Sequence, residues 1–357
     1  MKILIMAGGS GERFWPLSTK SRPKQLLPLI TEKSMIRETF ERVLKIANPE
    51  DIYIATNEIQ ASAISAEIPE LGKRNIIIEP AFKDTAAAIA YGSTIIERDS
   101  SDNPTIVVLA SDHLITDVDS FLDALKTASI EAEKNSIVTL GIKPSKPETG
   151  YGYIKIEDNV IGVPTKATEF MEKPNYETAL KYIENGSFVW NSGMFIFKYN
   201  IIMEEIKNYV PNHYKVISDI KKVIGQSTGL ELAHITKPFF NRFERISIDF
   251  AVMEKSKIIK CIPVDFGWND VGGFNSLEEI FNKDNKDNIS KDCTYIYVDS
   301  SNNIVISDRK NKLITSIGVS NMIIVDTDES LLVCNKNDGQ RIKELLKLIN
   351  LEYEKVN

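Results

Sequence analysis

The sequence predicts an α/β protein: a Rossmann-like, mostly parallel sheet covered by helices, followed by a small β domain. Two observations support this fold class. Up to about residue 280, short β-branched runs alternate with longer amphipathic segments. After about residue 285, brief apolar runs recur every eight to ten residues, separated by Asp, Ser, Asn and Gly. Regularly spaced short strands favour a stack of rungs, so we predict a short left-handed β-helix-like unit there.

The elements of the first part follow from these runs. Five continuous apolar runs have the character of buried strands: 2–7, 52–55, 76–79, 105–110 and 137–141. Four longer segments between them have the length and apolar spacing of helices: 34–47, 58–68, 84–98 and 119–134. In open α/β sheets, ligands bind beyond the carboxyl ends of the strands. The residues directly after these runs are therefore the first candidates for chemistry.

The second part contains shorter elements. Five brief runs are predicted as strands: 295–298, 304–306, 313–317, 322–325 and 331–333. A helix over 339–349 is predicted to close the unit. The Asn-, Lys- and Asp-rich stretch 282–292 is the expected boundary, which gives a catalytic domain over 1–284 and a β domain over 285–357.

Composition excludes several classes of protein. The 357 residues are 43% hydrophobic, enough for a sizeable core, and the net charge of −7 repels polyanions, so no nucleic-acid partner is expected. Three scattered cysteines without a CxxC pair indicate neither a disulfide framework nor a thiolate metal site. The apolar start is too short for a signal peptide, and no stretch reaches the ~20 apolar residues of a membrane span. We therefore expect a cytoplasmic protein with no membrane partner.

The strongest local signal is a glycine-rich loop after the first predicted strand. Small residues stand at Ala7, Gly8, Gly9 and Gly11. They let backbone N–H groups approach an anion, and Arg13 and Lys24 add two cations that could hold a triphosphate. The loop is not a dinucleotide fingerprint, because Phe14 stands where a third glycine is needed, and no GK[ST] follows. The alternative is a glycine turn with solvated charges, and the cations and position favour the phosphate site.

Two aspartates are candidates for a metal site. Asp112 follows the predicted strand 105–110 directly, and Asp270 lies in a polar turn. Carboxylates at such positions can coordinate Mg²⁺, which prefers oxygen ligands and bridging phosphates. The alternatives are a helix N-cap for Asp112 and an ordinary turn residue for Asp270.

A Glu-Lys pair precedes Pro174. Lys173 could contact a sugar phosphate while Glu172 accepts hydrogen bonds from sugar hydroxyls. The alternative is an exposed ion pair worth ~0–1 kcal/mol. The three histidines show no metal-ligand spacing and no Ser or Cys partner arrangement, so no activated side-chain nucleophile is indicated.

Seven ordered motifs carry a family resemblance. The segment GGSGERFWPLSTKSRPKQLLPL resembles the signature loop of nucleotidyltransferases that make nucleotide sugars, and its FWPLS and PKQ portions resemble the mannose-1-phosphate guanylyltransferases. Six later motifs are similar to the same family: EPAFKDTAAAIA (79–90), LASDH (109–113), TGYGYIK (149–155), FMEKP (170–174), WNSGMFIF (190–197) and WNDVGGF (268–274). The resemblance spans about three quarters of the chain.

The resemblance implies a reaction and a set of site residues. The reaction is transfer of GMP from GTP to mannose 1-phosphate, giving GDP-mannose and pyrophosphate, with Mg²⁺ held by Asp112 and Asp270. The implied catalytic residues are Arg13, Lys24, Asp112 and Lys173. The implied nucleotide-binding residues are Ala7, Gly8, Gly9, Gly11, Arg13, Lys24, Pro80, Thr85 and Ser111, with Pro80 and Thr85 beside the base. The implied sugar-phosphate-binding residues are Gly152, Glu172, Lys173 and Asn191.

The sequence departs from the family pattern at two places, and two other functions stay open. Lys83-Asp84 replaces the Arg-Asn expected before Thr85, which puts an acid near the base pocket, and Ser111 replaces an alanine. One alternative is another sugar-1-phosphate nucleotidyltransferase, using a different base or hexose. The other is a non-catalytic nucleotide-sugar-sensing subunit, which should lack the loop cations or a metal carboxylate.

The resemblance also bears on further domains and on assembly. The sequence ends at Asn357 without the isomerase domain of longer bifunctional relatives, so only the transferase activity is expected. The β domain could pair two subunits into a homodimer, cover one end of the catalytic domain, or do both.

Overall fold

The computed structural model describes residues 1–100 and 103–356. The chain divides into two compact units. Unit 1 comprises Met1–Gly8, Glu38–Ser111 and Ile115–Trp268; unit 2 comprises Gly9–Arg37, Asp112–Leu114 and Asn269–Asn357. The cation-bearing part of the glycine-rich loop therefore belongs to the same unit as the C-terminal strands. The predicted boundary between residues 284 and 285 divides the chain along its sequence, and it stays a prediction.

Within the described residues, unit 1 contains a nine-stranded sheet with the order β3-β2-β1-β4-β9-β6-β10-β8-β7. Its strands are β1 (Lys2–Met6), β2 (Ile52–Asn57), β3 (Ile76–Glu79), β4 (Thr105–Ala110), β6 (Ile137–Ile142), β7 (Tyr153–Ile156), β8 (Thr165–Met171), β9 (Phe188–Lys198) and β10 (Ile259–Val264). β3, β2, β1 and β4 are parallel neighbours, as the continuous apolar runs predict. β9 runs antiparallel between β4 and β6, so the complete sheet is mixed.

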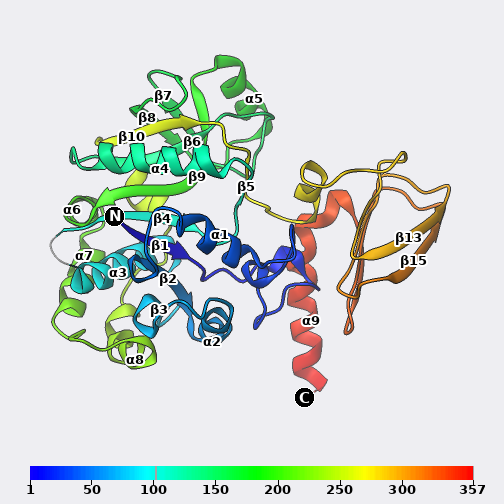
Figure 1. Cartoon of the computed structure of the whole chain (residues 1–357), viewed down its shortest axis with the longest axis horizontal. Helices are drawn as coiled ribbons and strands as arrows, with labels where there is room; N and C mark the ends of the chain where they lie inside the picture. The colour runs from blue at the N-terminus through cyan, green and yellow to red at the C-terminus, as the bar shows by residue number, and fades with distance from the viewer. Residues whose placement is uncertain (101–102, 357) are drawn as a thin grey trace. The chain divides into compact units, whose positions relative to one another are not determined.

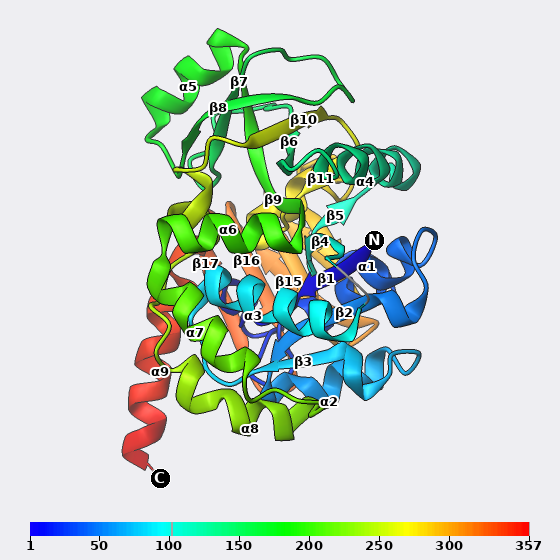
Figure 2. The same ribbon diagram turned by 90° about the vertical axis from the view of Figure 1, so that its left-hand side faces the viewer.

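Helices pack against this sheet through apolar faces. They are α1 (Met35–Val43), α2 (Glu58–Glu67), α3 (Asp84–Asp99), α4 (Val118–Ala132), α5 (Tyr176–Asn185), α6 (Tyr199–Tyr209), α7 (Pro211–Lys221) and α8 (Gly229–Phe240). Figure 2 shows α3, α6 and α7 grouped on one side of unit 1, where their aliphatic and aromatic side chains form one core with β1 and β4. Side-chain caps begin several of these helices; Asn57, for example, accepts a hydrogen bond from the Gln60 N–H at the start of α2.

In the part of unit 2 that the structure describes, two small sheets are built mainly of parallel strand pairs. One has the order β12-β14-β16-β17 and the other pairs β13 with β15, which lie side by side in Figure 1. The elements are η1 (Glu12–Phe14), η2 (Lys24–Leu26), η6 (Phe274–Glu279), β12 (Ile289–Lys291), β13 (Cys293–Val298), β14 (Ile304–Ser307), β15 (Lys312–Ile317), β16 (Met322–Asp326), β17 (Leu331–Asn335), η7 (Lys336–Arg341) and α9 (Ile342–Val356). The chain passes from one unit to the other within two short strands, β5 (Leu114–Ile115) and β11 (Trp268–Asn269).

A single apolar core joins the glycine-rich segment of unit 2 to its coils. Phe14, Leu27 and Leu29 from the N-terminal segment pack in one cluster with Ile304 and Ile323 of the coils. Because burying apolar surface is worth about 25 cal/mol per Å², this shared core fixes the segment that carries Arg13 and Lys24. The position of these two cations is thus set by packing as well as by charge.

The predicted α/β and β-helix-like elements are confirmed, with differences at their ends. Each strand predicted in the second part exists, and β12 was not predicted. The predicted helix 339–349 begins three residues later, because residues 336–341 form a 3₁₀ turn, and it continues to Val356. Within residues 1–100 and 103–356, no helix combines the length and apolarity that crossing a bilayer requires.

Candidate active site

The glycine-rich loop begins where β1 ends. In unit 1, the Ala7 N–H donates to the Ala55 carbonyl at 2.7 Å, which anchors the exit from the strand. In unit 2, Gln25 Nε2 donates to the Gly9 carbonyl at 3.1 Å, and Ser18 Oγ donates to the Gly11 carbonyl at 2.8 Å. These two side chains fix the Gly9 and Gly11 carbonyls of the loop.

Gly11 is required by its surroundings. Its φ is +62°, and an added Cβ would lie 2.4 Å from Lys24 Cβ and 2.6 Å from the Lys24 backbone nitrogen. Only a residue without a side chain allows so close an approach. The glycine therefore brings the loop backbone against the segment that carries Lys24.

Five predicted residues of unit 2 line one cavity of about 250 Å³, which we call the loop cavity: Gly11, Arg13, Lys24, Asp112 and Asp270. Lys24 is only 6% exposed, and its Nζ lies 2.8 Å from Asp112 Oδ2 and donates to the Asp270 carbonyl at 2.7 Å. Arg13 Nη1 donates to the Gly272 carbonyl at 2.6 Å. The loop cations and the two aspartates, distant in sequence, thus meet within one unit.

The turn that carries Asp270 is strained. Val271 has φ +47° although it is β-branched and fully buried, and its N–H donates to Asn269 Oδ1 at 2.7 Å. A β-branched residue in this region is a true outlier, and such strain persists only where surrounding packing imposes it. Val271 packs in the core of unit 2, so the turn is held in the form that directs the Asp270 carbonyl to Lys24.

The electrostatics of Asp112 favour a charged carboxylate. Burial, the largest single effect, would raise its pKa, but the charges of Lys24 and His113 and the hydrogen bonds to the carboxylate together outweigh burial, so the pKa lies below the ordinary value. No group of three or more His, Cys, Asp or Glu side chains suited to a metal occurs among the described residues. Two carboxylates on one cavity nevertheless fit Mg²⁺, which usually takes one or two protein carboxylates and completes its shell with water and phosphate.

A second candidate group lies in unit 1, at the carboxyl end of β3. An added Cβ on Gly8 would lie 3.1 Å from Glu79 Oε1, so the glycine leaves room for this carboxyl. Burial, followed by the charge of Asp84, raises the pKa of Glu79 to about 8. A carboxyl desolvated in this way gains strongly from a ligand that supplies hydrogen-bond donors.

The backbone conformation at the start of α3 suits Asp84, the acid that departs from the family pattern. Asp84 has φ +69°, a conformation that Asp and Asn tolerate better than other side-chain-bearing residues, and its Oδ1 accepts from the Thr85 N–H at 2.9 Å. An Asn oxygen could accept the same bond. Thr85 Oγ1 accepts from the Ile248 N–H at 2.8 Å, and Pro80 is half-buried in the same β3–α3 connection.

A third group in unit 1, which we call the Gly152 cluster, consists of Gly152, Glu172, Asn191 and Asp249. An added Cβ on Gly152 would lie 2.6 Å from Glu172 Oε2, and the Asn191 N–H donates to the Gly152 carbonyl at 2.8 Å. Asn191 Nδ2 donates to Asp249 Oδ1 at 2.8 Å. Three of the four predicted sugar-phosphate-binding residues, Gly152, Glu172 and Asn191, thus come together, with the second carboxylate of Asp249 beside them.

Asp249 and Glu172 affect each other. Burial, and then the charge of Glu172, raises the pKa of Asp249 to about 6. Lys173, with φ +49°, places its Nζ 2.8 Å from Glu172 Oε1 and is largely exposed. A site with two carboxylates, an amide and an exposed ammonium can bind vicinal hydroxyl groups and a phosphate.

Ser111 is buried, and its backbone makes hydrogen bonds within unit 1. It is 2% exposed, its N–H donates to the Met6 carbonyl at 3.1 Å, and its carbonyl accepts from Thr39 Oγ1 at 3.2 Å. These contacts hold the end of β4 against β1 in unit 1. The chain passes from unit 1 to unit 2 directly after this residue.

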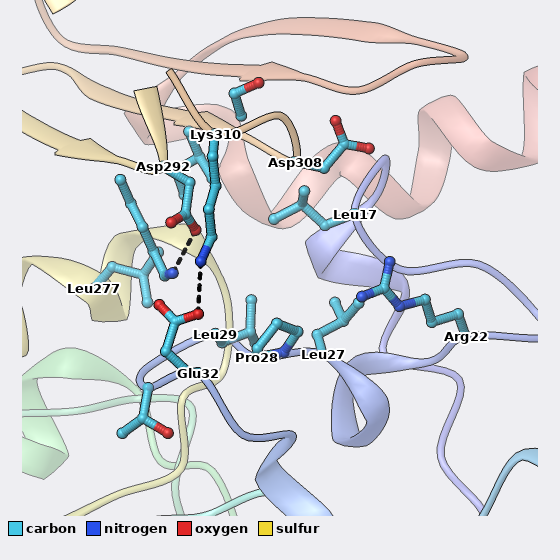
Figure 3. A pocket seen from close by; sticks show the side chains of 14 residues that line it. Leu17, Arg22, Leu27, Pro28, Leu29, Glu32, Leu277, Asp292, Asp308 and Lys310 are labelled. Carbon is cyan, nitrogen blue, oxygen red and sulfur yellow. Dashed lines mark hydrogen bonds and ion pairs between the residues drawn. The ribbon is translucent and has the colours of Figure 1, made fainter. Parts of the chain in front are cut away.

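A second cavity in unit 2 contains none of the predicted site residues. Figure 3 shows its apolar wall of leucines and Pro28, and an ion pair between Lys310 and Glu32 at 2.7 Å. Its lining includes neither a candidate metal carboxylate nor the glycine-rich backbone. The predicted site residues of unit 2 therefore line the loop cavity and not this one.

Comparison with known proteins gives the family. The sequence model of the Nucleotidyl transferase family matches residues 2–287. The chain belongs to the nucleotidyl transferase family. A second sequence model, the MannoseP isomerase/GMP-like beta-helix domain, matches residues 294–349, in agreement with the coils of unit 2.

Individual relatives of this nucleotidyl transferase align over nearly its whole length. It is 36% identical to mannose-1-phosphate guanylyltransferase 2 of Escherichia coli O157:H7, over 98% of the chain and 73% of the relative. It is also 36% identical to mannose-1-phosphate guanylyltransferase RfbM of Salmonella typhimurium, over 96% of the chain and 71% of the relative. The crystal structure of mannose-1-phosphate geranyltransferase from Thermus thermophilus superposes with a TM-score of 0.87 at 30% identity, covering 98% of this chain and 99% of that one.

Sequence reasoning on this nucleotidyl transferase missed three candidate residues. Lys343 of α9 lines the loop cavity, although some 320 residues separate it from Lys24 and no motif surrounds it. Asp249 lies in a segment without glycine or charge patterning that would attract attention. Glu79 could have been found, because it stands at the carboxyl end of a predicted strand, where ligands gather.

Proposed function

We propose that this chain is a mannose-1-phosphate guanylyltransferase, which converts GTP and mannose 1-phosphate to GDP-mannose and pyrophosphate. The observation that carries the proposal is the loop cavity, which Arg13 lines and in which Lys24 contacts both Asp112 and the Asp270 carbonyl. Relatives that bear this name align over nearly the full chain. A purely sensing subunit would not need these cations and carboxylates together.

The proposed chemistry needs no activated side chain. A phosphate oxygen of mannose 1-phosphate attacks the α-phosphorus of GTP, the new O–P bond forms, and the bond to the β-phosphate oxygen breaks to release pyrophosphate. A phosphate dianion is already nucleophilic, so the protein contributes positioning and charge neutralisation. We assign Arg13, Lys24 and the N–H groups of the glycine-rich loop to the triphosphate.

Magnesium is part of the proposal. Asp112 and Asp270 would hold the ion, and their oxygen donors on one cavity fit its preference. When bound, Mg²⁺ neutralises charge on the triphosphate. Lys24 already contacts Asp112, so divalent cations and this ammonium compete for one carboxylate.

We assign the hexose to the Gly152 cluster and its phosphate to Lys173. Glu172 and Asp249 supply acceptors for sugar hydroxyls, and the absence of a side chain at Gly152 lets a ligand approach the backbone. A site built from such polar groups discriminates between hydroxyl arrangements, because the wrong sugar leaves a buried group unpaired.

The guanine assignment rests on Glu79. Guanine presents adjacent N–H donors at N1 and N2, which a carboxylate accepts as a pair. Burial and the charge of Asp84 raise the pKa of Glu79 to about 8, so hydrogen-bond donors supplied by a ligand would favour its charged form. Binding of guanine should therefore lower this pKa and release a proton near neutral pH.

A pyrophosphate-release assay on the purified chain tests the function. ATP, GTP, CTP and UTP are each combined with mannose 1-phosphate or glucose 1-phosphate, with Mg²⁺ or with excess EDTA. The expected result is Mg²⁺-dependent turnover that is fastest with GTP and mannose 1-phosphate. Preference for another pair would favour a different sugar-1-phosphate nucleotidyltransferase, and no turnover with any pair would favour the sensing subunit.

Location and assembly stay predictions. The proposed cytoplasmic location is supported by three free thiols, Cys261, Cys293 and Cys334, since a reducing compartment keeps cysteines unpaired. A homodimer is the assembly to test by light scattering.

A further inference from the structure

The hydroxyl of Thr85 contacts a distant part of unit 1. Thr85 Oγ1 accepts from the Ile248 N–H at 2.8 Å, and the Ala86 N–H donates to the Ile246 carbonyl at 3.2 Å. Ile248 is 1% exposed. The first turn of α3 is thereby attached to the segment 246–248 by two hydrogen bonds.

This segment leads directly into the Gly152 cluster. Asp249 follows Ile248 and begins the π-helical turn Asp249–Met253, and its Oδ1 accepts from Asn191 Nδ2 at 2.8 Å. Asn191 Oδ1 in turn accepts from the Gly193 N–H at 3.0 Å. Both ends of the Asn191 amide are therefore held, and its orientation depends on where Asp249 lies.

We propose that Thr85 is a positioning residue for the hexose pocket: its hydroxyl fixes Ile248, and through the next residue it sets Asp249 and Asn191. The inference rests on the proposed assignment of the Gly152 cluster to the hexose. It differs from the direct contact with the base that the family resemblance implies for Thr85. Without the hydroxyl, a buried N–H group loses its acceptor, and the segment must shift to find another.

The test compares Thr85→Ala, which removes the acceptor, with Thr85→Ser, which keeps it. Mannose 1-phosphate and GTP are titrated separately into each full-length variant by calorimetry, and KM and kcat are measured for both substrates. Thr85→Ala should weaken mannose 1-phosphate binding about tenfold and raise its KM, with GTP affinity unchanged. Thr85→Ser should behave like the parent.

A matched control separates positioning from general destabilisation. Thr94, also in α3, donates its buried hydroxyl to the Ala90 carbonyl within the helix. Thr94→Ala removes a hydroxyl from the same helix without touching segment 246–248, so mannose 1-phosphate affinity should stay at the parental value. If Thr85→Ala does not fold, Thr85→Val carries the same comparison with Thr85→Ser.

The outcomes separate this inference from the proposed function. Loss of GTP affinity with normal mannose 1-phosphate affinity in Thr85→Ala would overturn the positioning role in favour of a base contact. Unchanged affinities for both would overturn it as well. A parental protein that neither binds nor turns over mannose 1-phosphate would overturn the proposed function itself, whatever the variants do.

Discussion

Replacing Gly152 with alanine places a methyl group against a candidate hexose ligand. The added Cβ would lie 2.6 Å from Glu172 Oε2, whereas ordinary contacts begin at 3.4 Å, so the carboxylate must retreat by 0.8 Å, the difference between these distances. Its other oxygen is held by Lys173 at 2.8 Å, which restricts the retreat. Because a misplacement of ~1 Å can cost ~100-fold, we expect kcat/KM for mannose 1-phosphate to fall by about 10–100-fold, or ~1.4–2.7 kcal/mol.

Steady-state kinetics with each substrate varied in turn measure this effect. The loss should appear mainly in the KM for mannose 1-phosphate, because hydroxyl contacts act in the ground state and the transition state alike, and GTP affinity should not change. Gly72→Ala is a matched control, since its Cβ would lie 3.5 Å from Asn75 Oδ1 and its φ of −68° suits alanine. A Gly152→Ala enzyme with the parental KM for mannose 1-phosphate would refute the assignment of Glu172 to the sugar.

Three further variants test the other groups. Gly11→Ala adds a Cβ 2.4 Å from Lys24 Cβ at φ +62°, so kcat/KM should fall at least ~100-fold; near-parental turnover would contradict the close approach of loop and lysine. Lys24→Met should lower kcat/KM by ~100–1,000-fold. Because this change removes the ammonium that competes for Asp112, it should also strengthen Mn²⁺ binding to the protein without nucleotide, which electron paramagnetic resonance measures. Unchanged Mn²⁺ affinity would count against a metal role for Asp112. Glu79→Gln tests the raised pKa of Glu79, which is about 8 in the folded protein and 4.5 as the ordinary value. Between pH 4.5 and pH 8 the folded parent holds a proton on Glu79 that the unfolded chain does not hold. The stability of the parent therefore falls as pH rises from 4.5 to 8. The Tm of Glu79→Gln relative to the parent should therefore rise from pH 5 to pH 9, and a constant difference would show that Glu79 is not desolvated.

The first strands were predictable because a single physical property dominates them. The run 105–110 is continuous, rich in β-branched residues and almost entirely buried, and its short length and β-branched content favour a strand over a helix. The insertion of β9 between β4 and β6 was not predictable in the same way. Strand order depends on long-range pairing, and nothing local in Phe188–Lys198 specifies an antiparallel neighbour.

The candidate residues were predictable by type and their contacts were not. The glycines and the cationic side chains of the loop indicate an anion site, because few other functions need glycines and cations in one segment. That Lys24 contacts Asp112 and the Asp270 carbonyl requires the tertiary fold, since 88 and 246 residues separate Lys24 from them. Asp249 escaped detection because its importance comes from Asn191 and Glu172, neither of which is near it in the sequence.

These contacts predict that Gly11 and Gly152 are sensitive to substitution. The side chains of Lys24, Arg13 and Asn191 are each held by hydrogen bonds within the protein. The entropy cost of ordering long side chains is therefore met during folding, and ligand binding need not supply it. Such ordering works only if the backbone can come close to the held groups, as it does at Gly11 and Gly152. A single methyl group at either glycine displaces a group that is already fixed, so its effect on affinity should exceed that of shortening a solvated cation on the surface.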